Sequence, residues 1–170
     1  MRIDLLSRTD RPLLISGLVL AAAAFALAGA WIYQSMGYVP CELCLKERYP
    51  YYATLPLGAL AIYFARRGSG LARVLLALLA AIFFASAIFG VYHAGVELKF
   101  WAGPTDCTGS YTKPSSMEEF IRQAQNTHIV RCDEVALRVF GLSLAAWNAL
   151  ISLGLSFVAA FGALTGQSKA

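Results

Sequence analysis

Charge is scarce in this 170-residue chain, and long stretches carry none at all. Only 14% of the residues are charged, whereas 58% are hydrophobic. No residue between Arg11 and Glu42 has a formal charge. Soluble globular domains carry about 25% charged residues. The composition therefore excludes most soluble folds and indicates a membrane protein.

Several motifs are also missing from the sequence. It has no Gly-x-Gly-x-x-Gly loop for a flavin or a nicotinamide, no internal repeat, and no run of basic residues typical of nucleic-acid binding. Only two histidines and four cysteines are present. We therefore expect a single domain over residues 1–170, without a nucleic-acid partner, whose chemistry depends on the cysteines.

Four apolar runs are long enough, or nearly so, to cross a bilayer, which takes about 20 residues. They predict an all-α integral membrane four-helix bundle with spans at about 13–36, 49–65, 74–93 and 140–164. The alternative for the first run is a cleaved signal peptide, but the run is too long for a typical one.

The spans leave two loops on one side of the membrane, at about 37–48 and 97–138. In the longer loop, Met117, Phe120, Ile121 and Ala124 follow the i, i+3, i+4, i+7 spacing of an amphipathic helix. We expect a short helix there, which either lies along the membrane surface or packs on the loop or the bundle.

The distribution of basic residues predicts the orientation, because Lys and Arg accumulate on the cytoplasmic side. The two chain ends and the loop between spans two and three hold seven bases and two acids, whereas the other two loops hold seven bases and eight acids. Both termini are therefore expected in the cytoplasm, and all four cysteines outside it.

The cysteines fall into two pairs, Cys41/Cys44 in the short loop and Cys107/Cys132 in the long one. On an oxidising side of the membrane they can form two disulfides. In a Cys-x-x-Cys motif a helix N-terminus and nearby cations such as Arg48 can stabilise a thiolate, which we expect at Cys44. From spacing alone, inert disulfides or a four-thiolate zinc site stay open as alternatives.

A dithiol that oxidises other proteins needs an electron acceptor. Nothing in the sequence encodes a bound prosthetic group. A lipid-soluble quinone fits this requirement, because it can diffuse to a dithiol at the membrane boundary and take two electrons.

The order of these features resembles the disulfide bond formation protein B family, DsbB. It comprises Pro40-Cys41-x-x-Cys44-x-x-x-Arg48, a span ending near His93, a loop with Cys107 and Cys132, and a fourth span opening with the segment 140–148, Phe-Gly-Leu-Ser-Leu-Ala-Ala-Trp-Asn. The resemblance covers nearly the whole chain and depends on the combination of features. It implies a multi-pass protein of the bacterial inner membrane.

The resemblance also implies a mechanism. A reduced periplasmic thioredoxin-like oxidase, similar to DsbA, would form a mixed disulfide with Cys107 and leave oxidised, and Cys132 would then attack Cys41. Cys44 would contact ubiquinone or menaquinone as an adduct or charge-transfer pair, and no metal would be needed. Arg48 and His93 would bind the quinone; the alternatives are a snorkelling arginine and a hydrated interfacial histidine.

Other polar residues near the cysteines receive structural interpretations. We expect Glu47 to be a solvated loop acid, and Gln34 and the tyrosines at 49, 51 and 52 to belong to the interfacial aromatic belt. Trp147 and Asn148 are expected to pack against another helix.

Two other functional classes fit parts of the sequence. A quinone or vitamin K epoxide reductase also combines a Cys-x-x-Cys with loop cysteines. Resemblance to that family would require the Cys-x-x-Cys to follow the loop pair, whereas in this chain it comes first. A small non-catalytic membrane subunit or chaperone with two structural disulfides is the third class.

Overall fold

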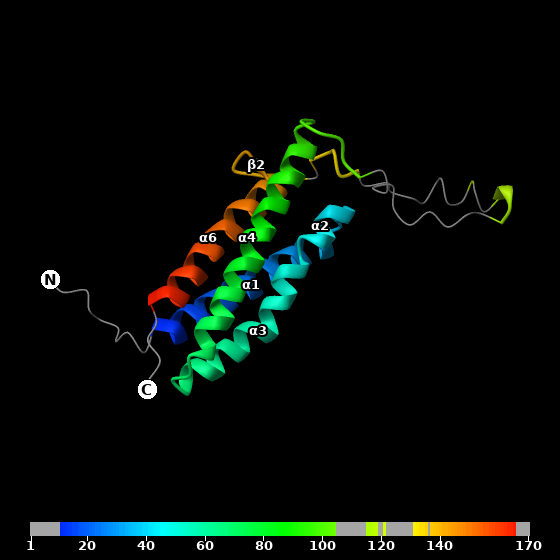
Figure 1. Cartoon of the computed structure of the whole chain (residues 1–170). Helices are drawn as coiled ribbons and strands as arrows, with labels where there is room; N and C mark the ends of the chain where they lie inside the picture. Colours follow the sequence, from blue (N-terminus) through cyan, green and yellow to red (C-terminus); the bar gives the residue numbers. More distant parts are fainter. Residues whose placement is uncertain (1–10, 105–114, 119–120, 122–130, 136, 166–170) are drawn as a thin grey trace.

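The computed structural model describes residues 11–104, 115–118, 121, 131–135 and 137–165. Four long helices run alongside one another (Figure 1). The connections from α1 to α3 and from α3 to α4 are short, whereas residues 98–143 separate α4 from α6. The elements are α1 (Arg11–Ser35), α2 (Glu42–Lys46), α3 (Tyr49–Arg66), α4 (Leu71–Glu97), β1 (Arg138–Val139), β2 (Leu142–Ser143) and α6 (Leu144–Thr165). The predicted amphipathic helix beginning near Met117 falls largely outside the described residues.

Three of the long helices, α1, α4 and α6, are long and apolar enough to cross a membrane. Apolar helices therefore form at three of the predicted spans. The fourth, α3, is 18 residues long, and its first half carries tyrosines, prolines and a threonine that lower its hydropathy. The chain is thus a multi-pass membrane protein, and the crossing of α3 stays a prediction.

Small residues bring the helices close together. On α4 and α6, buried alanines, serines and glycines alternate with larger apolar side chains, and a Cβ built on Gly90 would lie 2.9 Å from the backbone nitrogen of Ala149. Larger side chains, among them Phe83, Leu76 and Leu155, fill the centre between the helices. Helix association in lipid depends on such close packing, because burying apolar surface there gains little.

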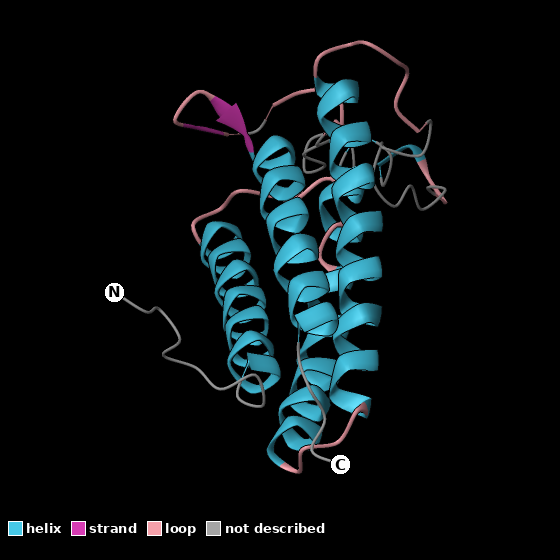
Figure 2. Cartoon of the chain, turned by 60° about the vertical axis from the view of Figure 1, so that its left-hand side comes forward, coloured by secondary structure: helices cyan, strands magenta, loops and turns pink. Residues whose placement is uncertain are grey.

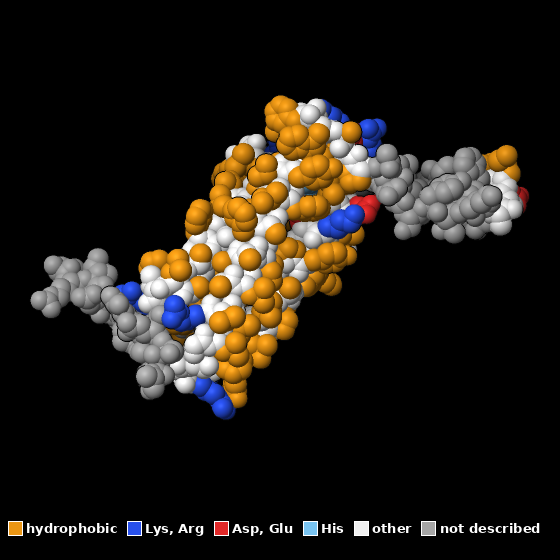
Figure 3. Space-filling model, viewed as in Figure 1, with side chains coloured by type: hydrophobic (Ala, Val, Ile, Leu, Met, Phe, Trp, Pro, Cys, Tyr) orange, Lys and Arg blue, Asp and Glu red, His pale blue; other side chains and the backbone are white. Residues whose placement is uncertain are grey.

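Large apolar side chains also cover the outside of the helices (Figure 3). Phe25, Phe157 and Leu164 are 78%, 67% and 80% exposed. In a soluble protein such a surface would cause aggregation. It is the surface expected of helices that face lipid.

The two ends of the helix array differ. The start of α1, the turn from α3 to α4 and the end of α6 lie at one end, and α2 and the β1–β2 hairpin lie at the other (Figures 1 and 2). The basic residues Arg11, Arg66 and Arg73 occur at the first end, where the Arg73 side chain donates a hydrogen bond to the carbonyl of Ala163. The Cys-x-x-Cys motif therefore lies at the end opposite to these bases.

The fourth apolar run begins differently from our prediction. We expected its helix to start near residue 140. Instead, residues 138–143 form a hairpin with two residues in each strand, and α6 starts at Leu144. Phe140 and Gly141 have φ angles of 50° and 82°, which a tight hairpin turn requires. The hydroxyl of Ser143 then accepts a hydrogen bond from the amide of Ala146 and caps α6.

The contact at Gly90 makes a testable prediction about helix packing. Gly90→Ala should lower the stability by about 1–3 kcal/mol, because the new methyl group meets backbone atoms of α6. The matched control is Gly154→Ala, where a Cβ meets nothing within 4 Å and the better helix propensity of alanine should be neutral or stabilising. Thermal unfolding in detergent, followed by circular dichroism, measures both. Equal melting temperatures for the two variants would contradict the packing argument.

Candidate functional site

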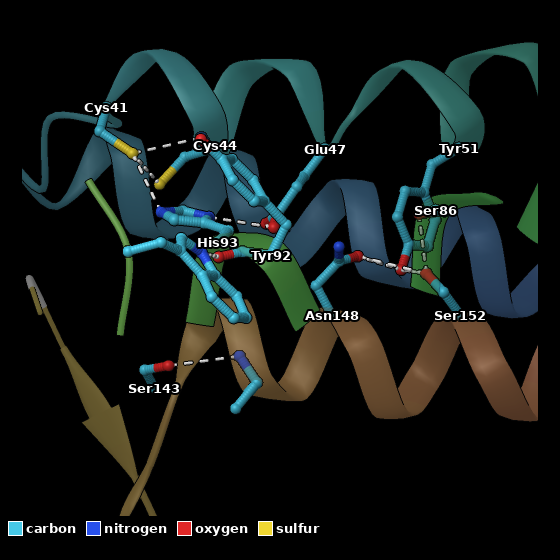
Figure 4. Close-up of polar contacts among 12 residues, drawn as sticks. Cys41, Cys44, Glu47, Tyr51, Ser86, Tyr92, His93, Ser143, Asn148 and Ser152 are labelled. Atoms are coloured by element: carbon cyan, nitrogen blue, oxygen red, sulfur yellow. Dashed lines mark hydrogen bonds and ion pairs between the residues drawn. The ribbon is translucent and has the colours of Figure 1, made fainter. Parts of the chain in front are cut away.

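The short helix α2 positions the two cysteines of the Cys-x-x-Cys motif. Cys41 is the N-cap of α2, and its sulfur accepts a hydrogen bond from the backbone amide of Cys44 at 3.2 Å. Both cysteines are free thiols, and their sulfur atoms lie 2.7 Å apart (Figure 4). One turn of helix thus holds the two sulfurs in contact, which is the arrangement that reversible disulfide formation requires.

His93, from the outer part of α4, contacts this pair. Its Nε2 atom lies 3.6 Å from the sulfur of Cys41, and its Nδ1 atom lies 3.0 Å from a carboxylate oxygen of Glu47. Cys41, His93 and Glu47 are all buried, with exposed fractions of 5%, 1% and 8%. The three side chains form a continuous chain from sulfur to carboxylate (Figure 4).

The expectation that Glu47 is a solvated loop acid was wrong. Residues 42–46 form a helix, and this turn directs Glu47 inward to His93. A signal was present in the sequence: Glu47 follows Cys44 by three positions and precedes Tyr51 by four, the spacing of one helix face. Lys46 instead pairs with Glu42 on the exposed side of α2.

The two thiols differ in acidity. The pKa of Cys41 is lowered to about 5, chiefly because the Cys44 thiol donates a hydrogen bond to it; His93 and the Cys44 amide also lower it, and burial opposes them. The pKa of Cys44 is raised, first by that same hydrogen bond and then by burial. Burial also raises the pKa of Glu47. In the reduced pair, the preference for the thiolate form therefore lies with Cys41.

Arg48 lies beside the site and is held by α1. Its guanidinium donates a hydrogen bond to the side-chain oxygen of Gln34 at 2.7 Å and a longer one to the carbonyl of Ala30 at 3.5 Å. These contacts fix the cation between α1 and the start of α3. Gln34, which we had assigned to the interfacial belt, therefore orients Arg48.

Cys132 packs against the same site from the long loop. It is 2% exposed, is disulfide-bonded, and belongs to one buried cluster with Cys41, Leu43 and Val96. Its neighbour Asp133 forms exposed ion pairs with Lys99, just beyond α4, and with Arg131. Cys107 lies outside the described residues.

A cavity of about 380 Å³ opens on the other side of the Cys-x-x-Cys pair. Cys44, Glu47 and Arg48 line it. The other lining residues include apolar side chains of α1, of the segment between α1 and α2, of the hairpin and of α6, such as Phe25, Val39, Phe140, Leu144 and Ile151. The volume lies within the range of small-molecule sites, which are mostly apolar with a few polar groups. Cys44 rather than Cys41 therefore faces the space that a ligand can occupy.

A buried polar network continues from the cavity wall into the helix array. The hydroxyl of Tyr51 donates to the Oδ1 atom of Asn148 at 2.7 Å and lies 3.1 Å from the hydroxyl of Ser152, which in turn contacts Ser86 at 3.0 Å. Tyr51 is 5% exposed, so its assignment to the interfacial belt was wrong. Asn148 does join another helix, as expected, while the indole of Trp147 donates to the carbonyl of Val139 in the hairpin.

One atom of this network lacks a partner among the described residues. The Nδ2 group of Asn148 is buried and forms no hydrogen bond there, although Asn148 lines the cavity. An unmade hydrogen bond of a buried donor costs about 1–3 kcal/mol. A ligand with an acceptor oxygen in the cavity would satisfy it.

Cys41, Cys44 and His93 bring three potential metal donors within 4.8 Å of one another. The sulfur separation of 2.7 Å is, however, shorter than the roughly 3.8 Å between two thiolates on one tetrahedral zinc ion. The sulfur positions of Cys41 and Cys44 are therefore those of a dithiol pair and not those of two zinc ligands.

The chain was compared with known proteins. Residues 12–162 match the sequence profile of the family described as "Disulfide bond formation protein DsbB". A relative from Rickettsia prowazekii (strain Madrid E), "Uncharacterized protein RP370", is 24% identical over 149 residues, which cover 86% of this chain and 84% of that protein. No solved structure matches.

The acidity difference between the thiols is testable on the reduced protein. Cys41 should react with a neutral alkylating reagent with a midpoint near pH 5, because the thiolate is the reactive form above its pKa, and Cys44 should react only above its ordinary value of 9.0. Limiting reagent and mass spectrometry of the peptides distinguish the two sites. A lower midpoint at Cys44 than at Cys41 would reverse our assignment of the thiolate.

Proposed function

This chain belongs to the DsbB family, and on that basis we propose that it is a membrane thiol–disulfide oxidoreductase that supplies disulfides to a soluble partner. The partner is a periplasmic thioredoxin-like oxidase similar to DsbA. Electrons pass from it through Cys107/Cys132 and Cys41/Cys44 to a membrane quinone, ubiquinone or menaquinone. The catalytic residues are these four cysteines, and Arg48 lines the cavity that would hold the quinone. His93, the second residue expected to bind the quinone, contacts Cys41 instead and is not among the residues that line the cavity.

One observation carries this proposal. The disulfide-bonded Cys132 packs beside Cys41, and an apolar cavity lies beside Cys44. Cys132 shares a buried cluster with Cys41, and Cys44 lines the cavity. Thiol–disulfide exchange needs sulfurs that can approach one another, and electron transfer to a lipid-soluble acceptor needs a site at the dithiol. The Cys41/Cys44 pair satisfies both conditions.

The sulfur chemistry proceeds by exchange of bonds. Reduction of the loop disulfide by the partner frees the Cys132 thiolate, which attacks the sulfur of Cys41 in the oxidised Cys41–Cys44 pair. A Cys132–Cys41 bond forms, the Cys41–Cys44 bond breaks, and Cys44 leaves as a thiolate facing the cavity. Cys107 then attacks Cys132, restores the loop disulfide and releases Cys41.

The cavity residues fit a quinone. Its apolar walls suit the ring and the isoprenoid tail, and quinone carbonyl oxygens accept hydrogen bonds. Two donors are available: the Arg48 guanidinium, and the Nδ2 group of Asn148, which has no other partner among the described residues. Reoxidation of Cys41 and Cys44 to a disulfide supplies the two electrons and two protons that convert a quinone to its quinol.

We further propose a location and an orientation. The protein is a single domain over residues 1–170 in the bacterial inner membrane, where α3 crosses as the fourth span. Both termini are cytoplasmic and the cysteines are periplasmic. Among the described residues, the end opposite to α2 carries Arg11, Arg66, Arg67 and Arg73 but no acidic residue, and this excess of positive charge supports the orientation.

The two cysteine pairs can be tested separately. Cys41→Ser and Cys44→Ser should each abolish quinone reduction, with any reductant, while leaving the helical fold intact, because helix packing holds the fold. Cys132→Ser should stop turnover with a reduced thioredoxin-like partner but still permit quinone reduction by a small dithiol. The measurements are quinol formation and circular dichroism of the same samples. Loss of the fold in the first two variants, with no quinone reduction by the native protein, would favour structural disulfides.

The quinone site makes its own prediction. Arg48→Ala and Asn148→Leu should each raise the quinone concentration for half-maximal rate by roughly 10- to 100-fold, because a hydrogen bond to the carbonyl is lost. Lys46→Ala is the matched control: this lysine pairs with Glu42, lies two residues from Arg48, and is not among the residues that line the cavity. An unchanged value in both variants would place the quinone elsewhere.

A further inference from the structure

The contact between Cys41 and His93 joins two segments far apart in the sequence. The sulfur accepts the Cys44 amide hydrogen at 3.2 Å and lies 3.6 Å from His93 Nε2. At the opposite edge of the ring, Nδ1 is 3.0 Å from Glu47, which follows directly after α2. Both ring nitrogens are therefore engaged by groups that bear, or can bear, a negative charge.

Burial makes this arrangement selective for one protonation state. A buried carboxylate or thiolate is costly unless it is paired. A neutral imidazole has one N–H and can donate to only one of its two neighbours, whereas an imidazolium donates to both. The protonated ring thus satisfies Glu47 and a Cys41 thiolate at once.

Other charged groups around the site modify this balance. Cys44 contacts Cys41 as a thiol, Glu97 lies one helical turn beyond His93 on α4 and interacts electrostatically with both His93 and Cys41, and Arg138 in β1 acts on Glu97. From α3, Tyr51 interacts electrostatically with Glu47. The thiolate preference of Cys41 agrees with this charge distribution, since His93 contributes to it through both its hydrogen bond and its charge.

We propose that His93 is a catalytic residue that takes the proton of Cys41 and holds it as an imidazolium beside the thiolate, and that Glu47 is a positioning residue that fixes the ring for this role. This extends the proposed function, which gives His93 no contact with the quinone cavity. Its sequence signature is Cys41 and Glu47 six residues apart, combined with a histidine in the last two turns of α4, the second long helix after them.

The role of this pair fits each sulfur step. When Cys107 attacks Cys132 and breaks the Cys132–Cys41 bond, the electron pair of that bond stays on Cys41, and the adjacent imidazolium stabilises the leaving thiolate. When the Cys41 thiolate later attacks Cys44 to reform the disulfide, the two electrons pass to the quinone that the proposed function names as the acceptor. The two protons of the quinol are those released when the partner dithiol is oxidised: Cys44, released as a thiolate, takes up one and becomes a thiol, and His93 holds the other. Sulfur oxidation and proton release therefore balance without an additional base.

The test is the pH dependence of Cys41 alkylation in the reduced protein, which involves no quinone. His93→Gln keeps a hydrogen-bonding amide but cannot hold the proton. At pH 6 it should slow alkylation of Cys41 by roughly tenfold or more, since each unit of pKa is a factor of ten in thiolate. Near pH 10 it should react like the native protein, because the thiol then ionises unaided. Glu47→Gln, which keeps an acceptor for Nδ1 but removes the charge, should give a smaller shift in the same direction.

Glu42→Gln is the matched control. It neutralises a carboxylate on the exposed side of α2 that pairs with Lys46, and the midpoint of Cys41 should not move. A general loosening of the site would change the rate at every pH rather than shift the midpoint. If His93→Gln does not accumulate as a folded protein, the midpoint of Cys41 alkylation in Glu47→Gln alone tests the proposal. An unchanged Cys41 midpoint in the folded variants would overturn the proposal.

Quinol formation, measured on the same samples, separates the two conclusions. An unmoved midpoint with intact quinone reduction would refute the role of His93 and leave the proposed function standing. A shifted midpoint in a protein that reduces no quinone would support the histidine–thiolate pair and refute the quinone as acceptor.

Discussion

The buried contact between Glu47 and His93 connects the short helix α2 to the long helix α4, and the geometry of both cysteines depends on it. Helix α2 has only five residues, and a helix this short is unstable on its own. Its position comes from what it buries: Leu43 packs with Val96, and Glu47 reaches His93. A reactive dithiol is thereby mounted on a rigid membrane helix, although it lies in a connecting segment.

Polar groups inside the helix array are confined to a few connected positions. Tyr51, Asn148, Ser152 and Ser86 hydrogen-bond one another across α3, α4 and α6. In an apolar environment, such groups can form hydrogen bonds only with each other. These hydrogen bonds therefore fix how the three helices are aligned. The network ends at the cavity with the amide nitrogen of Asn148, which links the packing of the helices to the shape of the ligand site.

The sequence predicted the parts of this protein that follow from local pattern. Long charge-free runs located α1, α4 and α6, and the spacing of the cysteines located the dithiol. The hairpin at Phe140 and Gly141 was missed because its residues are apolar and continue into the apolar run of α6. Gly141 and the capping Ser143 were the two signals that the helix starts later. The spacing of Glu47 from Cys44 and Tyr51 was a signal that these residues share one helix face. Their partners could not be predicted, because they depend on which helix lies opposite, and His93 is 46 residues from Glu47 along the chain. Cys107 and most of the helix predicted near Met117 lie outside the described residues, so those expectations stay predictions.

The ion pairs of Asp133 have a consequence for how its neighbour, Cys132, is held in place. Lys99 and Arg131 hold Asp133 at the water-exposed end of α4, and they keep the pKa of its carboxyl well below its usual range. Such exposed pairs contribute little to stability and weaken as salt is added. The segment that carries Cys132 is therefore held by exposed ion pairs and by the packing of the Cys132 side chain in a buried cluster with Cys41 and Val96. Added salt should therefore weaken the ion pairs of this segment while leaving the apolar contact of Cys132 unchanged.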